Sequence, residues 1–380
     1  MDQRTPSKLA YDAVMAAREV AATSATRAEA EDRDGGFPAD DVADLARLGL
    51  LAAPVPSAEG GMGLGEEPGA GELPDVLRVV GYGSLALGRL YEGHVNAVQL
   101  VARYGTPAQR TRLFADAQKG HLFGVWNTDP PGDCLKLGED GRLRGVKSFA
   151  SGAGFVTRAL VTVKREPGTP PLMLVVPLSP GSRADLTAWR VHGMRASATG
   201  TVDFEGIAIT QDEILGGWDD YHRQPAFSGG AWRFAAVQLG GIEAVFDAWR
   251  GHLSATGRGD DPHQLARFGE GAIAVQGARQ WVERAALTVT EDALAPERVV
   301  AFVNLARLAV EKAGLEVLQL AQRSVGLQGF LREHPLERLS RDLATYLRQP
   351  APDRALTTAA AEILGAGGSA GDLFEGWDAR

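Results

Sequence analysis

The chain has 380 residues, of which 44% are hydrophobic and 23% charged, a composition typical of globular proteins and unlike that of disordered chains. Its formal net charge of −9 argues against a general nucleic-acid or anionic-membrane binder, because such proteins need a cationic surface that releases counterions. The single cysteine, Cys134, excludes an internal disulfide and a multi-cysteine zinc site, and no apolar stretch reaches the roughly 20 residues of a transmembrane helix. We therefore expect a cytoplasmic protein of two or three domains, without a metal site, a nucleic-acid partner or a membrane anchor.

Residues 8–120 are predicted to form an N-terminal helical domain. Val42, Leu45 and Leu48 recur at helical spacing, which indicates one apolar helix face. Further on, Thr106 and Pro107 are the residue types preferred at the N-cap and at the first position of a helix. A new helix is therefore predicted to begin at this point.

Residues 121–215 are predicted to form a central β-domain. Short runs rich in β-branched residues, at 160–163, 172–176 and 201–205, are bounded by Gly or Pro. No pattern of helix length separates them, which indicates an antiparallel sandwich or barrel rather than a parallel sheet.

Residues 230–364 are predicted to form a C-terminal four-helix bundle. One long stripe of apolar residues steps by three and four, as expected for a helix with one buried face: Val299, Phe302, Ala306, Ala309, Ala313, Val317 and Leu320. Residues 365–380 are Gly-rich and polar and are predicted to be a mobile tail. The fold class is therefore mainly α with a central antiparallel β-domain.

Six segments, in this order along the chain, resemble motifs of the acyl-CoA dehydrogenase family of flavoproteins. Residues 331–342 (LREHPLERLSRD) are similar to the family's "EYPVERLYRD", and the other five segments are 48–63, 105–109, 123–130, 145–152 and 192–199. Each motif alone is a weak signal, but six in the right order predict the family's fold, though not the reaction. The resemblance also implies an FAD cofactor and a homodimer or homotetramer.

The resemblance places flavin-facing residues in the β-domain. Asn127 and Thr128 lie in the segment similar to the "TEP" strand, while Phe149 and Ser151 stand for the Trp and Thr of "WITN". A flavin ring needs a flat apolar surface and hydrogen bonds that tune its electronics. Since Phe149 and Ser151 are two apart on a predicted strand, they should share one face and supply stacking and a hydrogen bond. The alternative is that all four are ordinary packing residues of the β-domain.

In the bundle, the resemblance implies that Arg258, Arg323 and Gly326 bind the FAD phosphates or adenosine. Arg258 stands where the family has an Arg, although the family's following Phe-Gly pair is missing. Arg323 replaces a Gln at the start of the turn that contains Gly326, and an Arg there could pair bidentately with a phosphate. The alternative for both arginines is a surface ion pair.

The family's catalytic base is missing from its expected position. Family dehydrogenases use a Glu, about eight residues after the "RD" motif, to remove an α-proton of an acyl thioester. Counting from Arg341 and Asp342 puts Pro350 there, and proline has no side-chain proton acceptor. Some relatives carry the Glu on an earlier bundle helix, and the resemblance puts Trp232 at that position in this chain.

Three hypotheses follow for the reaction. The first is an FAD-dependent oxidoreductase acting on an acyl thioester or related small molecule, with Asp353 as a displaced base; the alternative for Asp353 is a turn-forming residue. The second is a flavin-dependent monooxygenase, which needs no α-proton base and in which His94 could support the reaction with O₂; the alternative for His94 is a core or capping histidine. The third is a catalytically silent flavin-binding or interaction protein. The electron acceptor or flavin reductase is not defined by the sequence.

Overall fold

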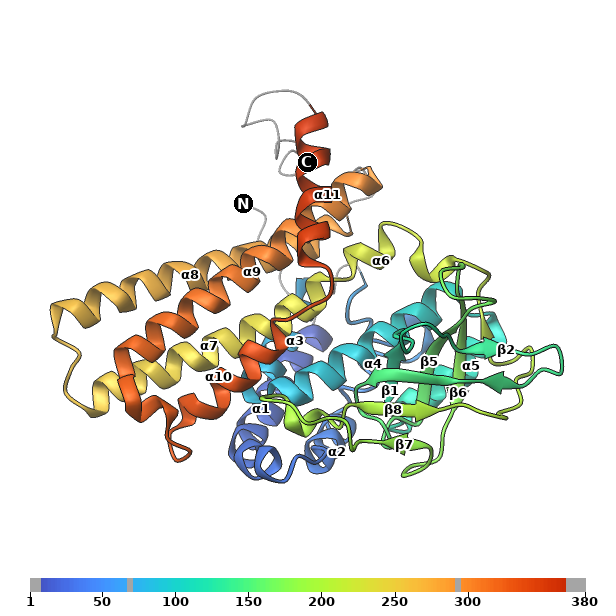
Figure 1. The fold of residues 1–380 in the computed structure, drawn as a ribbon, viewed down its shortest axis with the longest axis horizontal. Coiled ribbons are helices and arrows are strands. Elements are labelled where there is room, and N and C mark those ends of the chain that lie inside the picture. The colour runs from blue at the N-terminus through green and yellow to red at the C-terminus, as the bar shows by residue number, and fades with distance from the viewer. Residues whose placement is uncertain (1–7, 67–70, 291–294, 367–380) are drawn as a thin grey trace. The chain divides into compact units, whose positions relative to one another are not determined.

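A computed structural model describes residues 8–66, 71–290 and 295–366 (Figure 1). The predicted mobile tail, 365–380, lies outside the described residues from residue 367 onward. The chain divides into two compact units, Met1–Arg223 and Gln224–Arg380, and each is described by itself.

The first unit begins with five helices, which are α1 (Lys8–Asp34), α2 (Ala39–Arg47), α3 (Leu73–Gly83), α4 (Leu85–Tyr104) and α5 (Pro107–Gln118). The predicted helix start at Thr106 is confirmed. The Thr106 hydroxyl accepts a hydrogen bond from the backbone N–H of Gln109, and the Gln109 side chain accepts one from the backbone N–H of Thr106. This reciprocal cap satisfies two N–H groups that a helix start otherwise leaves without a partner.

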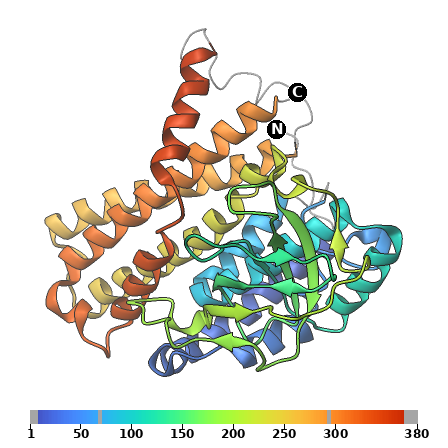
Figure 2. The ribbon, with the colours of Figure 1, turned by 45° about the vertical axis from the view of Figure 1, so that its right-hand side comes forward.

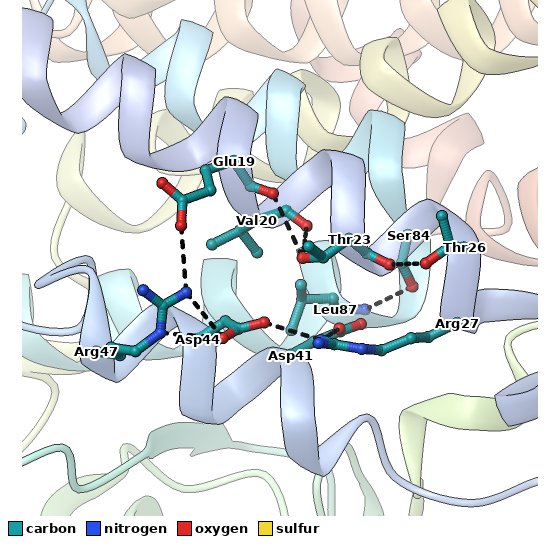
Figure 3. A network of polar contacts seen from close by, with 10 residues as sticks. All are labelled: Glu19, Val20, Thr23, Thr26, Arg27, Asp41, Asp44, Arg47, Ser84 and Leu87. Carbon is teal, nitrogen blue, oxygen red and sulfur yellow. Dashed lines mark hydrogen bonds and ion pairs between the residues drawn. The ribbon is translucent and has the colours of Figure 1, made fainter.

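An ionic network joins α1 to α2 (Figure 3). The Arg27 guanidinium lies 2.6 Å from a carboxylate oxygen of Asp41 and 2.8 Å from one of Asp44. Arg47 contacts both Asp44 and Glu19. Burial raises the pKa of Asp41 even though Arg27 opposes that shift, because a buried carboxylate loses its hydration. The network therefore fixes α2 against the long first helix.

The β-domain follows in the same unit and is built from three small sheets. Strands β1 (Phe123–Trp126), β5 (Arg158–Val163), β6 (Leu172–Pro177) and β9 (Ile214–Leu215) form the largest in that order. A second sheet has the order β4 (Val146–Ala150), β8 (Gly200–Asp203) and β7 (Ala184–Asp185), and β2 (Lys136–Leu137) pairs with β3 (Leu143–Arg144). The two views in Figures 1 and 2 show these strands beside the N-terminal helices.

One strand pair differs from the predicted antiparallel arrangement. β1 and β5 are parallel, with Phe123 opposite Arg158, whereas the other strand pairs in the described residues are antiparallel. Between β1 and β5 the chain passes through β2, β3 and β4. It therefore re-enters the first sheet in the same direction, through the long crossover that parallel pairing requires.

Helices α4 and α5 cover one face of the largest sheet. Their apolar residues share a single core cluster with residues of β1, β5, β6 and β9: Ala97, Val98, Val101, Leu113, Phe114, Ala117, Phe123, Leu160, Met173, Val175 and Leu215. Because burial of apolar surface is the main favourable term in folding, this shared core makes the helices and sheets one unit.

The second unit is a helix bundle. Its helices are α6 (Ala226–Gly229), α7 (Trp232–Ala255), α8 (Pro262–Thr288), α9 (Pro296–Val325), α10 (Pro335–Tyr346) and α11 (Pro352–Gly365). α9 packs against α7, α8 and α11, and the predicted apolar stripe of α9 is largely buried. At Gly314 a Cβ would lie 2.9 Å from a methyl group of Leu347, so a larger residue here would require the Leu347 side chain to shift. The predicted fold class, helical domains with a central β-domain, is confirmed. Within the described residues, no helix is long and apolar enough to cross a membrane.

Candidate functional site

Three segments of the first unit that carry motif residues meet beside the β-domain. The N–H of Ser148 donates to the carbonyl of Thr128 (2.9 Å), which ties the end of β4 to the loop after β1. The N–H of Gly152 donates to the carbonyl of Ser197 (2.9 Å), which ties the same segment to the turn at residues 194–199. The structure thus brings Thr128 and Ser151 together with a motif to which the sequence had assigned no role.

Phe149 lies at a β-bulge near the end of β4. The register of β4 and β8 shifts between Lys147 and Ala150, and Phe149 has a φ of 52°, in the left-handed region. The predicted placement of Phe149 and Ser151 on one strand face is therefore wrong, because the bulge interrupts the alternation of side chains and Ser151 follows the last strand residue. The bulge leaves the Phe149 ring 67% exposed.

Ser151 ends a chain of three hydroxyl groups. Thr199 Oγ1 donates to Ser151 Oγ at 3.2 Å, and Ser197 Oγ lies 2.8 Å from Thr199 Oγ1. Ser197 and Thr199 are only 1% and 4% exposed, whereas Ser151 is half-buried. Thr199 and Ser197 are two residues apart in the "S.T" end of the family motif, and that spacing of hydroxyls is the signal that could have found them.

Asn127 and Thr128 follow β1 instead of lying within it. The Asn127 Oδ1 accepts a hydrogen bond from the buried Thr162 hydroxyl (2.7 Å), so this amide is turned into the β-domain. The Thr128 side chain is exposed. Of the two side chains, only the Thr128 hydroxyl is therefore exposed and accessible to a ligand.

A buried ion pair anchors the loop that carries Thr128. Lys147 is fully buried, and its Nζ lies 2.5 Å from Asp129 Oδ1, while Lys164 Nζ lies 2.7 Å from Asp129 Oδ2. Burial alone would raise the pKa of Asp129, but the two lysines outweigh it and hold that pKa below its usual value. Asp129 replaces the Glu of the "TEP" motif and still supplies the carboxylate that Lys147 needs.

His94 is a fully buried residue of α4 and uses both ring nitrogens within the protein. Its Nε2 lies 2.7 Å from the carbonyl of Leu51, and its Nδ1 accepts the backbone N–H of Phe123 at 3.1 Å. Burial lowers the pKa of His94 to about 4, so the ring is neutral near pH 7. These contacts favour the core-histidine alternative over a role in the reaction with O₂.

The candidate phosphate-binding residues of the second unit lie together at one end of α9. The Arg258 guanidinium donates to the carbonyl of Ser324 (3.2 Å), next to Arg323 in the last helical turn, and Gly326 follows with a φ of 75°. Both arginines are exposed, and neither forms an ion pair within the part of the chain that the structure describes. The described residues therefore contain no surface ion pair of the kind that the predicted alternative required.

Two family models match this chain. The acyl-CoA dehydrogenase N-terminal domain matches residues 12–121, and the C-terminal domain matches residues 216–347. The chain belongs to the acyl-CoA dehydrogenase family.

Similar proteins within this family include monooxygenases. A dibenzothiophene monooxygenase of Rhodococcus erythropolis is 27% identical, with 88% of this chain and 89% of the relative covered. An L-evernosamine nitrososynthase of Micromonospora sp. is 29% identical, with 83% and 81% covered. FMN-bound TdsC of Paenibacillus sp. A11-2 has a TM-score of 0.82 at 20% identity, covering 94% of this chain and 98% of that one, a likeness that concerns the fold.

Neither family position for a catalytic base holds a carboxylate in this member. Pro350 lies exposed between α10 and α11, and its carbonyl accepts a hydrogen bond from the Arg307 guanidinium (2.7 Å). Trp232 begins α7 with a buried indole whose N–H has no partner among the described residues. Asp353 is an exposed residue in the first turn of α11, a common place for an acidic side chain that interacts with the helix dipole.

Proposed function

We propose that this protein is a flavin-dependent monooxygenase that oxygenates a small-molecule substrate. The observation that carries the proposal is the absence of a carboxylate at both family base positions, Pro350 and Trp232, in a chain that keeps the hydroxyl and aromatic residues of the flavin motifs. Oxygenation needs no α-proton base, whereas dehydrogenation of a weak carbon acid does. The similarity to dibenzothiophene monooxygenases and a nitrososynthase supports the same reaction class.

The residues of the first unit fit a flavin ring. Phe149 offers an exposed flat surface, and Thr128 and Ser151 offer hydroxyl groups on two segments that a backbone hydrogen bond links, the loop after β1 and the end of β4. A bound reduced flavin supplies two electrons to O₂, so that one oxygen atom enters the substrate and the other leaves as water. In this scheme Phe149 supports the ring, the two hydroxyls orient it, and His94 holds α4 against β1 without exchanging protons.

A flavin phosphate is the ligand that we propose for Arg258 and Arg323. Two exposed guanidinium groups that form no ion pair in the described part of the chain can each donate several hydrogen bonds to phosphate oxygens. FAD and FMN both carry such a phosphate. FAD is the family expectation and FMN is the cofactor in the TdsC structure, so we propose a flavin here and let titration with each decide.

A flavin reductase and a second copy of this chain are the proposed partners. Each turnover of such an oxygenase oxidises one reduced flavin. A separate reductase must therefore supply reduced flavin for the next turnover. Large apolar side chains on α8, including Leu265 (55% exposed) and Ile273 (75% exposed), suit a homodimer or homotetramer. Light scattering of the purified protein measures that state.

The decisive experiment compares two reactions on the same flavin-loaded protein. With reduced flavin regenerated by NADH and a reductase, aerobic incubation with heteroaromatic sulfides and amines should give products heavier by one oxygen atom, labelled from ¹⁸O₂. Under anaerobic conditions, a panel of acyl-CoA thioesters should leave the absorbance of the oxidised flavin unchanged. Rapid bleaching by a thioester would instead establish dehydrogenation and overturn the proposal.

A further inference from the structure

We propose that Thr199, supported by Ser197, sets the hydroxyl of Ser151 as a hydrogen-bond donor toward the flavin and so favours binding of the oxidised form. The inference rests on the proposed flavin function and assigns positioning residues to it. It starts from the three linked hydroxyls in the turn at residues 194–199 and the segment after β4.

The number of hydroxyl protons limits which of the three residues can donate to which. Each hydroxyl has one proton to donate. Thr199 donates its proton to Ser151 Oγ, so the 2.8 Å contact between Ser197 and Thr199 is a hydrogen bond only when Ser197 turns its own proton from the Met194 carbonyl to Thr199. The proton of Ser151 itself then has no acceptor among the described residues, and Ser151 is half-buried. The series of hydroxyls therefore ends in a proton that is available to a ligand.

The surroundings of Ser197 allow its hydroxyl to donate to Thr199. The Ser197 hydroxyl donates to the carbonyl of Met194 at 2.8 Å and lies at the same distance from Thr199 Oγ1, so its one proton serves one of these acceptors at a time. The Met194 carbonyl accepts two further hydrogen bonds, from the indole N–H of Trp189 (3.1 Å) and from the backbone N–H of Ser197 (3.2 Å). It stays satisfied when the hydroxyl turns to Thr199, so no buried acceptor is left unpaired.

Backbone hydrogen bonds fix the two segments that carry the three hydroxyls relative to each other. The N–H groups of Gly152 and Ala153 donate to the carbonyls of Ser197 and Ala198, each at 2.9 Å, and the indole N–H of Trp126 donates to the Ser151 carbonyl (2.9 Å). Because Ser197 and Thr199 are buried, water does not compete for their protons, and each donated bond strengthens the next along the chain.

A fixed donor discriminates between the two redox states of a flavin. Nitrogen N5 of the ring accepts a hydrogen bond when the flavin is oxidised and carries a proton when it is reduced. A Ser151 hydroxyl that donated to N5 would favour the first state and oppose the second. One ordinary hydrogen bond corresponds to about fivefold in an equilibrium constant, so this is the expected preference for the oxidised form.

The test measures the dissociation constants of oxidised and reduced flavin, the latter anaerobically, for Thr199→Val, Thr199→Ser and Ser151→Ala. Thr199→Val should lower the preference for oxidised flavin about fivefold, equivalent to one hydrogen bond. Thr199→Ser should restore it to within twofold, because the hydroxyl remains. Ser151→Ala should shift the ratio at least as much, and adding Thr199→Val to it should change nothing further, since the threonine acts only through the serine. Thr288→Val, which removes a buried hydroxyl of α8, is the matched control and should leave the ratio unchanged.

The outcomes separate this inference from the proposed function. A wild-type protein that binds neither FAD nor FMN overturns both. Flavin binding in which Ser151→Ala shifts the ratio but Thr199→Val weakens both redox states equally overturns this inference alone, because an equal loss is what a merely structural threonine would produce. If Thr199→Val does not fold, Ser197→Ala carries the test and should shift the ratio in the same direction by a smaller factor.

Discussion

The motif positions of the β-domain and those of the bundle have changed in different ways. In the β-domain two substitutions keep the functional group: Asp129 for Glu still pairs with Lys147, and Ser151 for Thr still provides a hydroxyl. In the bundle the substitutions change the functional group. Pro350 stands where a carboxylate is expected, and the cationic Arg323 stands where a neutral amide is expected.

This difference indicates which part of the chemistry this chain retains. The retained groups are those that would hold a planar redox ring, and the altered groups are those that would remove a proton from a thioester or hold the far end of the cofactor. The same architecture can therefore serve a different reaction, because function depends on the site and not on the fold. The predictions below test each side of the comparison.

The largest effect is expected from Lys147→Met in the retained region. The variant leaves the buried Asp129 carboxylate with one of its two lysines, and breaking a buried pair costs about 3 kcal/mol of unfolding free energy when a second partner remains. Urea denaturation measures the loss. Lys164→Met is the matched control: its side chain is 20% exposed, so we expect about 1 kcal/mol or less. Equal losses in the two variants would show that burial of Lys147 is not what anchors this loop.

His94→Leu should change how stability depends on pH. The pKa of His94 is lowered from 6.5 to about 4 in the folded protein, so the unfolded chain binds the proton first as the pH falls. The stabilisation by the neutral ring is present above pH 6.5 and is lost as the pH falls toward 4, which amounts to about 2 kcal/mol by pH 5. In the variant the unfolding free energy should fall less steeply over this range. Identical slopes would mean that His94 titrates normally and is open to solvent, which would return it to the list of catalytic candidates.

Local patterns in the sequence predicted the secondary structure well. The cap at Thr106, the apolar stripe of α9 and the strands around residues 160–163 and 172–176 follow from preferences that act over a few residues. The same local patterns predicted a helical region, then a β-region, then a second helical region. The parallel pairing of β1 with β5 was missed, because strand direction depends on where the chain returns and not on the strand's own residues.

The site was predicted less completely, because its details depend on long-range contacts. The bulge at Phe149 arises where β4 meets β8, more than 50 residues later in the chain. The two partners of His94, Leu51 and Phe123, are likewise distant in sequence. The family motif therefore predicted Ser151 and Phe149 as site residues, but only the structure showed that Thr199 and Ser197 form hydrogen bonds in series with the serine.

Phe149→Gly should separate the binding role of the ring from its structural cost. A φ of 52° is strained for phenylalanine and free for glycine, so the variant should be as stable as the wild type or more stable by up to about 1 kcal/mol. Loss of the aromatic surface should weaken flavin binding about tenfold, the scale of one stacking contact. Thermal melting and flavin titration measure the two quantities, and Phe149→Tyr, which keeps a ring, should stay near the wild type in both. Unchanged flavin affinity in the glycine variant would remove Phe149 from the site.

The smallest effect is expected from Asp353→Asn in the altered region. Asp353 is exposed in the first turn of α11, so the variant loses only the favourable interaction of a carboxylate with the helix start, about 0.5 kcal/mol. Turnover with reduced flavin and O₂ should stay within twofold of the wild type, because no step of oxygenation uses this carboxylate. Oxygen consumption and product formation measure it, with Asp40→Asn, another exposed acid in the first turn of a helix, as the control. If Asp353→Asn instead abolished bleaching of the flavin by an acyl thioester, the base would have moved by three residues rather than disappeared. The bundle would then retain the catalytic carboxylate of the family, and the contrast with the β-domain would not hold.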